Sequence, residues 1–213
     1  MWVEKIFWQD PYLTELTAQV TGVVGQEITV DRTIAYAFSG GQESDHGTIN
    51  GHEIIRAEKQ NKQIVYVLEP SHKLLVGDRV LMKIDWERRY KLMQLHFTAE
   101  VILELCNQYY NNPPKIGAHI AADKARLDFV WTGNISKTFE FLTAQFNLLK
   151  AKQLPIVSHF SDQENEIRYW EVEGFARVLC GGTHIRNTGE LAEVVLKRNN
   201  IGKNKERIEL TFR

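Results

Sequence analysis

Residues 85–114 read DWERRYKLMQLHFTAEVILELCNQYYNNPP, and this stretch separates two kinds of sequence pattern. Within it, apolar residues recur every three or four positions, the spacing of an amphipathic helix: Leu92, Leu95, Ala99, Ile102 and Cys106. The run Asn-Asn-Pro-Pro follows, and proline cannot continue a helix. The pattern therefore predicts a helix over 86–109.

The chain before this helix is rich in short segments of β type. Segments 28–34, 64–68 and 79–84 are rich in Val, Ile and Thr, and Gly, Asn, Asp and Pro separate them. Asn50-Gly51 is a favoured two-residue hairpin turn. Such a series predicts a small β-barrel or a compact sheet, and we expect an N-terminal β-barrel-like lobe over residues 1–86.

The chain after this helix mixes both patterns. A second helix is predicted over 136–153, with Ser136 as its N-cap and an apolar face made by Phe139, Leu142, Phe146 and Leu149. Strands are predicted at 168–175, 191–197 and 207–212. The fold class is therefore α+β: the N-terminal lobe, followed over 87–213 by an α/β lobe with an antiparallel sheet and packed helices.

Composition limits the class of protein only broadly. The 213 residues carry a net charge of −1, no run of 18 apolar residues and only two cysteines. We expect a cytoplasmic protein without disulfides or a membrane segment. The last nineteen residues hold six basic and two acidic residues, a candidate surface for nucleic acid. On charge alone, an ordinary solvated hairpin with a lysine-rich turn is the preferred interpretation.

Two pairs of residues have metal-ligand spacing. His96 and Glu100 are four apart on the first helix and project from one face. Cys180 and His184 enclose two glycines, which let the backbone fold back so that both side chains face one point. Each pair alone has a simpler explanation: a buried histidine–carboxylate hydrogen bond, or a small buried cysteine in a turn. Together they supply enough ligands for one zinc ion.

Seven motifs together resemble the freestanding alanyl-tRNA editing proteins called AlaX and the editing domain of alanyl-tRNA synthetase. In chain order they are Ser39-Gly40-Gly41-Gln42 with Asp45 and Gly47, Asp85-Trp86 with Arg89, Gly117-Ala118-His119-Ile120, Arg126-Leu127-Asp128-Phe129, Cys180-Gly181-Gly182-Thr183-His184, Thr188-Gly189-Glu190-Leu191 and Lys205-Glu206-Arg207-Ile208-Glu209. They cover most of the chain in the family's order and fit its medium-length type.

The sequence departs from this family at two positions. The family's helix motif is usually H-x-x-x-H, whereas this chain reads His96-Phe97-Thr98-Ala99-Glu100. Two roles are open to Glu100: a fourth zinc ligand, or a base that orients water. A third reading is that the site has lost zinc. A family glutamine near the pocket is replaced here by Ala122.

The resemblance implies a trans-editing deacylase that hydrolyses the ester of serine, and also glycine, on tRNA(Ala). It implies Zn2+ bound by His96, Cys180 and His184, with Glu100 as a possible fourth ligand. Catalytic candidates are Glu100, Thr98 and Thr183. Candidate contacts to tRNA are Gly40, Gly41, Gln42, Arg88, Arg89, Lys203 and Lys205.

Three other functions are compatible with the same residues. The chain can be a tRNA-binding module with a degenerate site, a zinc hydrolase for another aminoacyl or amide substrate, or a protein with a purely structural metal. The sequence leaves the choice between monomer and homodimer open.

Overall fold

The computed structural model describes residues 2–213 and shows a mixed α+β fold, the class that the sequence predicts. Contacts divide the described chain into two compact units. The first contains the residues up to Ser39 and Glu43–Tyr90, and the second contains Gly40–Gln42 and Lys91–Arg213.

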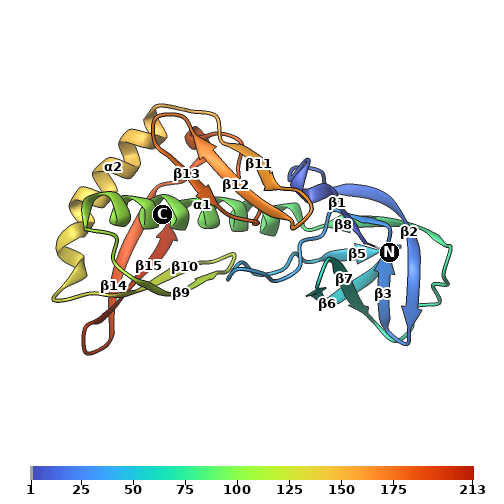
Figure 1. Cartoon of the computed structure of the whole chain (residues 1–213). Coiled ribbons are helices and arrows are strands. Elements are labelled where there is room, and N and C mark those ends of the chain that lie inside the picture. The colour runs from blue at the N-terminus through green and yellow to red at the C-terminus, as the bar shows by residue number, and fades with distance from the viewer. Residues whose placement is uncertain (1) are drawn as a thin grey trace. The chain divides into compact units, whose positions relative to one another are not determined.

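In the first unit, six antiparallel strands hydrogen-bond in a closed ring (Figure 1). Their order is β2-β3-β7-β6-β5-β8, and β8 pairs with β2 to complete the ring. The strands are β2 (Glu15–Val24), β3 (Glu27–Val30), β5 (Gly47–Ile49), β6 (His52–Gln60), β7 (Gln63–Leu68) and β8 (Arg79–Ile84). A short parallel pair, β1 (Glu4–Lys5) with β4 (Arg32–Thr33), lies outside the ring, and a 3-10 turn, Ile6–Trp8, follows β1.

Alternation along these strands places the apolar core of the first unit. Every second residue of β8 is buried, the pattern of a strand with one face against a core. Ile28, Tyr66 and Met82 are among the fully buried side chains. The predicted turn at Asn50-Gly51 joins β5 to β6, and both residues have positive φ (52° and 85°), as a type I′ turn requires.

Helix α1 spans Trp86–Tyr109, as the sequence predicts. The side chain of Asp85 accepts a hydrogen bond from the backbone amide of Arg88 at 3.0 Å, which caps the first turn. Asn111 and Asn112 both have positive φ and lead the chain away from the helix before the two prolines. The first turn belongs to the first unit and the remainder to the second.

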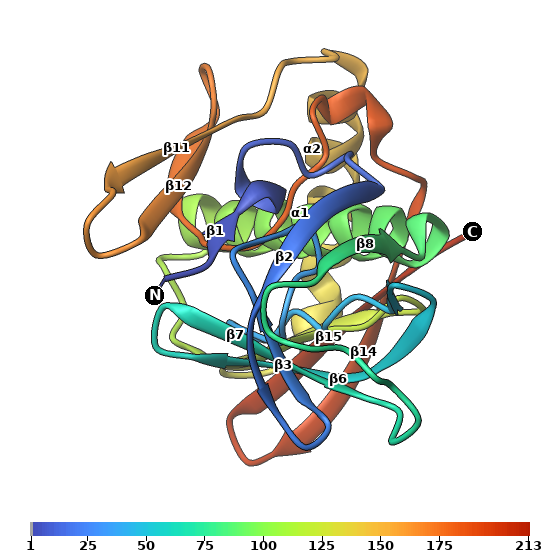
Figure 2. The same cartoon turned by 90° about the vertical axis from the view of Figure 1, so that its right-hand side faces the viewer.

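In the second unit, α1 lies between two antiparallel sheets (Figures 1 and 2). One sheet has the order β14-β15-β10-β9 and the other the order β11-β12-β13. The strands are β9 (Lys115–Ile120), β10 (Ala125–Val130), β11 (Val157–Asp162), β12 (Ile167–Val172), β13 (Ala176–Leu179), β14 (Val194–Gly202) and β15 (Lys205–Phe212). A 3-10 turn at Thr188–Glu190 precedes β14.

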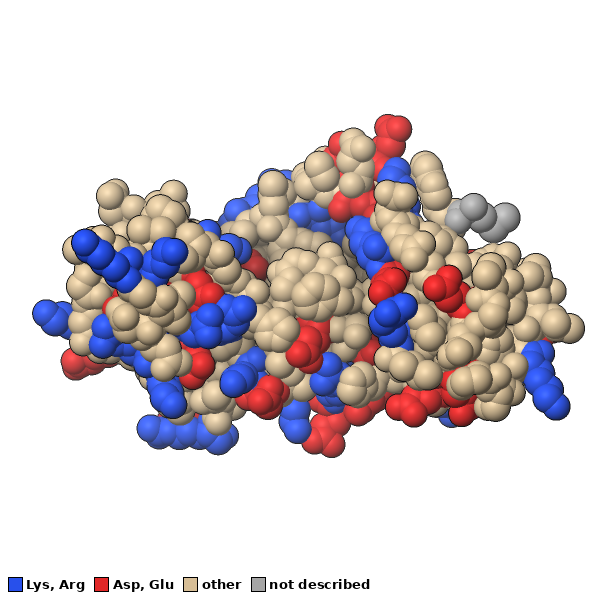
Figure 3. Space-filling view, turned by 90° about the horizontal axis from the view of Figure 1, so that it is seen from below, with Lys and Arg blue, Asp and Glu red and all other residues tan. Residues whose placement is uncertain are grey.

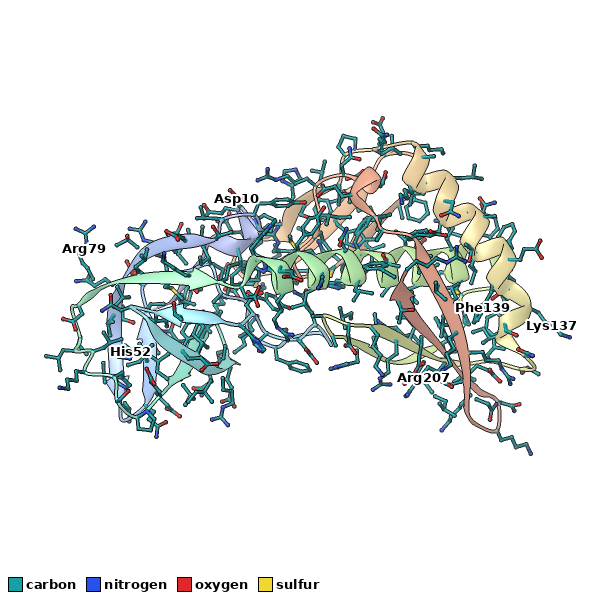
Figure 4. All side chains as sticks on the ribbon, turned by 180° about the vertical axis from the view of Figure 1, so that it is seen from behind. Asp10, His52, Arg79, Lys137, Phe139 and Arg207 are labelled. Carbon is teal, nitrogen blue, oxygen red and sulfur yellow. The ribbon has the colours of Figure 1, made fainter. Side chains whose placement is uncertain are left out.

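Helix α2 covers Phe139–Ala151 and begins three residues later than predicted; Phe139 is labelled in Figure 4. A 3-10 turn, Ile135–Thr138, comes first. Asn134 caps this turn by accepting the Ser136 amide at 2.9 Å, so the prediction of Ser136 as N-cap was wrong. The buried face is mostly as predicted: Leu142, Phe146 and Leu149. None of the described helices is long and apolar enough to cross a membrane.

Three residues of the glycine-rich segment, Gly40–Gln42, group with the second unit, although we expected them in the N-terminal lobe. The Ile120 amide donates to the Gly41 carbonyl at 2.8 Å, and Gln42 forms a parallel bridge with Ile120 at the end of β9. Gly41 has φ of 90°, and a Cβ there would lie 2.8 Å from the Ala118 carbonyl oxygen. Glycine is therefore required for the segment to reach this edge strand.

Candidate metal centre

Helix α1 brings two of the predicted site residues to one face. Residues four apart lie about 40° apart around a helix axis, and His96 Nε2 lies 3.4 Å from Glu100 Oε1. His96 is buried, and only 16% of the Glu100 side chain is exposed. The imidazole therefore faces the interior of the second unit with the carboxylate beside it.

The CGGTH loop follows β13 and carries the other two predicted ligands. The Cys180 amide donates to the Arg168 carbonyl of β12 at 2.9 Å, which extends the sheet pairing to the cysteine. A Cβ at Gly182 would lie 2.1 Å from His96 Cε1, whereas a Cβ at Gly181 would meet nothing within 4 Å. Of the two glycines, Gly182 is thus the one that close packing requires.

His96, Cys180 and His184 have ligand atoms that all lie within 4.8 Å of one another. Cys180 Sγ is 3.5 Å from His96 Nε2. Sulfur at roughly 2.3 Å and nitrogen at roughly 2.0–2.1 Å from one tetrahedral zinc ion would also be about 3.5 Å apart. His184 Nε2 is buried and has no hydrogen-bond partner within residues 2–213. A bound metal would satisfy this nitrogen, and a thiolate with two imidazoles suits zinc.

Neighbouring polar side chains contact the second nitrogen of each imidazole. His96 Nδ1 is 2.7 Å from Gln42 Oε1, and His184 Nδ1 is 3.5 Å from Ser158 Oγ of β11. Gln42 is fully buried against this imidazole, and its predicted contact with tRNA stays a prediction. Sequence reasoning missed Ser158, because a single serine on a strand has no recognisable ligand spacing.

The charges in this cluster depend on one another. Burial alone lowers the pKa of His96, but Cys180 and Glu100 outweigh burial and raise this pKa to about 10. Burial raises the pKa of Cys180, yet His96 and His184 outweigh it and the pKa falls to about 6. Burial also raises the pKa of Glu100, and its contact with His96 reverses this to about 2. A thiolate, the form that binds metals, is therefore present at neutral pH.

Glu100 lies beside the group of three ligands and is not a member of it within the described chain. Its Oε2 accepts a hydrogen bond from Trp170 Nε1 at 3.1 Å. Trp170 is fully buried on β12 and packs edge-on against Phe97, with ring centroids 5.0 Å apart. The indole therefore fixes the carboxylate by one oxygen. No local sequence pattern indicates Trp170, since this contact joins residues far apart in the chain.

The two threonines considered as catalytic candidates lie in different places. Thr183 is buried in the CGGTH loop, and its Oγ1 accepts a hydrogen bond from Gln42 Nε2 at 2.9 Å. Thr98 is two residues from His96 and so lies about 200° away around α1. It is fully buried, and its Oγ1 has no partner in the part of the chain that is described. The helix thus directs Thr98 to a different side from His96, and its catalytic role stays a prediction.

Arg89 is completely buried in the first unit, and its predicted contact with tRNA stays a prediction. Its guanidinium pairs with Asp45 and donates to the Ile34 carbonyl at 2.6 Å. The neighbouring Arg88 is partly exposed and pairs with Glu43 at 2.7 Å. The two arginines differ because consecutive residues point about 100° apart on a helix.

The lysines predicted to contact tRNA lie at the end of the β14–β15 hairpin. Lys203 and Lys205 are both exposed. Basic side chains gather on the left of Figure 3, over the end of the second unit that carries this hairpin. Further along β15, Arg207, labelled in Figure 4, is bound to Asp128 of β10 at 2.6 Å and so supports the sheet.

Comparison with known proteins first shows which class of domain this chain resembles. Residues 167–209, which contain CGGTH, match the family described as the threonyl and alanyl tRNA synthetase second additional domain. The chain is also 30% identical over 227 residues to the alanine–tRNA ligase of Methanococcus maripaludis, a match that covers 97% of this chain and 25% of the ligase. Residues 167–209 of the second unit are therefore similar to a tRNA synthetase additional domain.

Two freestanding proteins match this chain over nearly their whole length. The alanyl-tRNA editing protein AlaX-M of Pyrococcus horikoshii is 31% identical over 218 residues, covering 97% of this chain and 96% of the relative. The AlaX-M protein of Methanosarcina barkeri is 31% identical over 240 residues, covering 98% of each. The chain belongs to the AlaX-M family of alanyl-tRNA editing proteins, which confirms the resemblance noted in the sequence.

Proposed function

We propose that this chain is a zinc-dependent deacylase that hydrolyses the ester joining serine, and also glycine, to the 3′ end of tRNA(Ala). The observation that carries the proposal is the group of His96, Cys180 and His184, whose ligand atoms all lie within 4.8 Å of one another. The names of the AlaX-M relatives support tRNA(Ala) as the substrate. In this proposal residues 87–213, together with Gly40–Gln42, form the editing domain, and the ring of strands within 1–86 is a small β-barrel lobe.

The ligand group and Glu100 divide the chemistry between them. Zinc held by His96, Cys180 and His184 would supply a Lewis acid that holds the aminoacyl group and lowers the pKa of a nearby water. Glu100 is ionised at neutral pH, and Trp170 fixes its Oε2. Its Oε1 is then placed to accept a hydrogen bond from the attacking water. Because Trp170 already holds the other oxygen of this carboxylate, we favour this role over that of a fourth ligand.

Thr183 supports discrimination against alanine. A binding pocket for alanine rejects a molecule with one extra hydroxyl by only about 100-fold, so an error of this kind needs a second site. Thr183 places a buried hydroxyl next in the chain to the ligand His184. A serine hydroxyl can hydrogen-bond there, whereas alanine would leave polar groups unpaired.

Contact with the tRNA backbone is assigned to exposed positions of the second unit. Lys203 and Lys205 can reach phosphates, and the exposed Gly40 with the half-buried Gly41 offers backbone amides to the terminal nucleotides. Arg88 and Arg89 are omitted, because their side chains are already paired in the first unit. Binding by the lysines would weaken as salt rises, since phosphate contacts release counterions.

The test compares release of serine, glycine and alanine from tRNA(Ala) by the wild type and by His96→Ala. We expect rapid loss of serine, sparing of alanine, and no activity or zinc in the variant. A wild type that releases none of the three faster than buffer would exclude the deacylase.

Two further variants separate the possible roles of Glu100. Glu100→Gln should keep zinc and slow hydrolysis by at least about 100-fold, as expected for loss of a group that assists proton transfer. Glu104→Gln is the matched control, because this carboxylate lies one turn further along α1 and accepts from Asn107 and Gln108. If Glu100→Gln loses zinc while Glu100→His retains it, Glu100 is a ligand and our assignment is wrong.

A further inference from the structure

We infer that Gln42 is a positioning residue of the metal centre: its side-chain amide determines which nitrogen of His96 is available to a metal and ties His96 to the CGGTH loop. The inference rests on the proposed metal site. It assigns to the glycine-rich segment a role in building the site, distinct from contact with the tRNA.

The orientation of the Gln42 amide follows from its neighbours. The backbone N–H of Thr183 can only donate, and it points at Gln42 Oε1 with a separation of 3.2 Å. This atom must therefore be the amide oxygen. The amide nitrogen then faces Thr183 Oγ1 at 2.9 Å and donates to it. Both ends of the amide are thus fixed by one residue of the CGGTH loop.

The same oxygen determines the state of the His96 ring. Gln42 Oε1 is 2.7 Å from His96 Nδ1, and an oxygen that can only accept requires a hydrogen on Nδ1. In the neutral imidazole the lone pair is then on Nε2, the atom 3.5 Å from Cys180 Sγ. The hydrogen bond at one ring nitrogen is the usual means by which proteins direct the other nitrogen to a metal.

The surroundings of Gln42 hold its side chain in this position. Its side chain is fully buried, and its backbone is bridged to Ile120. A Cβ at Gly182 would lie 2.7 Å from Gln42 Oε1 and 2.5 Å from His96 Nδ1. The missing side chain at Gly182 is therefore what allows the amide and the imidazole to meet. Without the amide, the His96 ring could turn or carry its hydrogen on Nε2, where it would block a metal.

The experiment measures zinc affinity of the full chain by competition with a chromophoric chelator, and Co2+ absorption as a probe of the thiolate ligand. Gln42→Ala should bind zinc 10- to 100-fold more weakly, the usual effect of losing such a partner. Gln42→Glu should stay within about threefold of the wild type or bind more tightly, because a carboxylate also accepts from both N–H groups. Rescue by glutamate separates positioning of His96 from a general loss of structure.

Gln94→Ala is the matched control, since Gln94 is half-buried on the same helix as His96 and donates to the Glu190 carbonyl at 2.6 Å. It should leave zinc affinity unchanged. If Gln42→Ala does not fold, Gln42→Met keeps the volume without a strong acceptor and is expected to show the same loss. If Gln42→Ala or Gln42→Met binds zinc as tightly as the wild type, only the inference about Gln42 is overturned. If the wild type itself binds no zinc, the proposed function is overturned.

Discussion

Alanine at Gly182 should disable the metal centre, whereas alanine at the adjacent Gly181 should not. A Cβ at Gly182 would lie 2.1 Å from His96 Cε1, and non-bonded carbon atoms pack at roughly 3.5 Å. The His96 ring would have to retreat by about 1.4 Å. A Cβ at Gly181 would enter open space. The two substitutions are chemically identical and occur in the same loop, so they isolate the contact with His96.

The size of the effect follows from the tolerance of metal sites. Ligand distances must hold within about 0.2 Å, so a ring displaced by about 1.4 Å no longer binds. Loss of one of three protein ligands should lower zinc affinity by at least about 100-fold, equivalent to about 2.8 kcal/mol. Overpacking in a buried region should also lower the free energy of unfolding of the metal-free protein by about 1–3 kcal/mol.

Zinc affinity by chelator competition and thermal unfolding with and without zinc check this prediction. The wild type and Gly181→Ala should gain stability from zinc, and Gly182→Ala should not, because only bound metal stabilises the folded state. Wild-type affinity in Gly182→Ala would show that the packing argument is wrong. An equal loss of zinc affinity in Gly181→Ala would show that the effect comes from loop flexibility and not from the contact with His96.

Two other predictions concern the cysteines and the buried arginine. Iodoacetamide should alkylate Cys180 in the zinc-free protein at a rate that rises through pH about 6 and then levels off, because only the thiolate reacts. Bound zinc should protect Cys180 from alkylation. Cys106 should not react, because burial raises its pKa to about 12. Peptide mass spectrometry measures this, and a midpoint at the ordinary thiol value of 9.0 would contradict the charge arrangement. Arg89→Leu should lower the free energy of unfolding by about 3–5 kcal/mol by leaving Asp45 buried and unpaired, whereas Arg88→Leu should cost about 1 kcal/mol or less. Urea titration measures the free energy of unfolding of both variants. Equal losses in the two would contradict the difference expected between a buried and a partly exposed arginine.

Features set by neighbouring residues could be predicted from the sequence. The bounds of α1 followed from its apolar spacing and from the Asn-Asn-Pro-Pro run, and the hairpin turn at Asn50-Gly51 followed from its residue types. The grouping of His96, Cys180 and His184 could also be predicted. His96 with Glu100, and Cys180 with His184, have metal-ligand spacing, and the motifs resemble a known family.

Features set by contacts between distant residues could not be predicted in this way. Adjacent arginines look equivalent in the sequence, yet Arg89 is buried and Arg88 is not. The contact of Glu100 with Trp170 joins residues 70 apart, and no local pattern marks it. Gln42 lies 54 residues from His96. Its motif was visible, but the direction of its side chain depends on the folded backbone.

The bond between Gln42 and Thr183 spans 141 residues. Closing so long a loop is entropically costly, and contacts of this kind form late in folding. During synthesis, residue 42 leaves the ribosome long before residue 183, so the proposed zinc site cannot be completed until most of the chain has been made. Metal uptake in the cell would then report that a chain has finished folding, and a fragment starting at α1 would retain His96, Cys180 and His184 without the glutamine that aligns them.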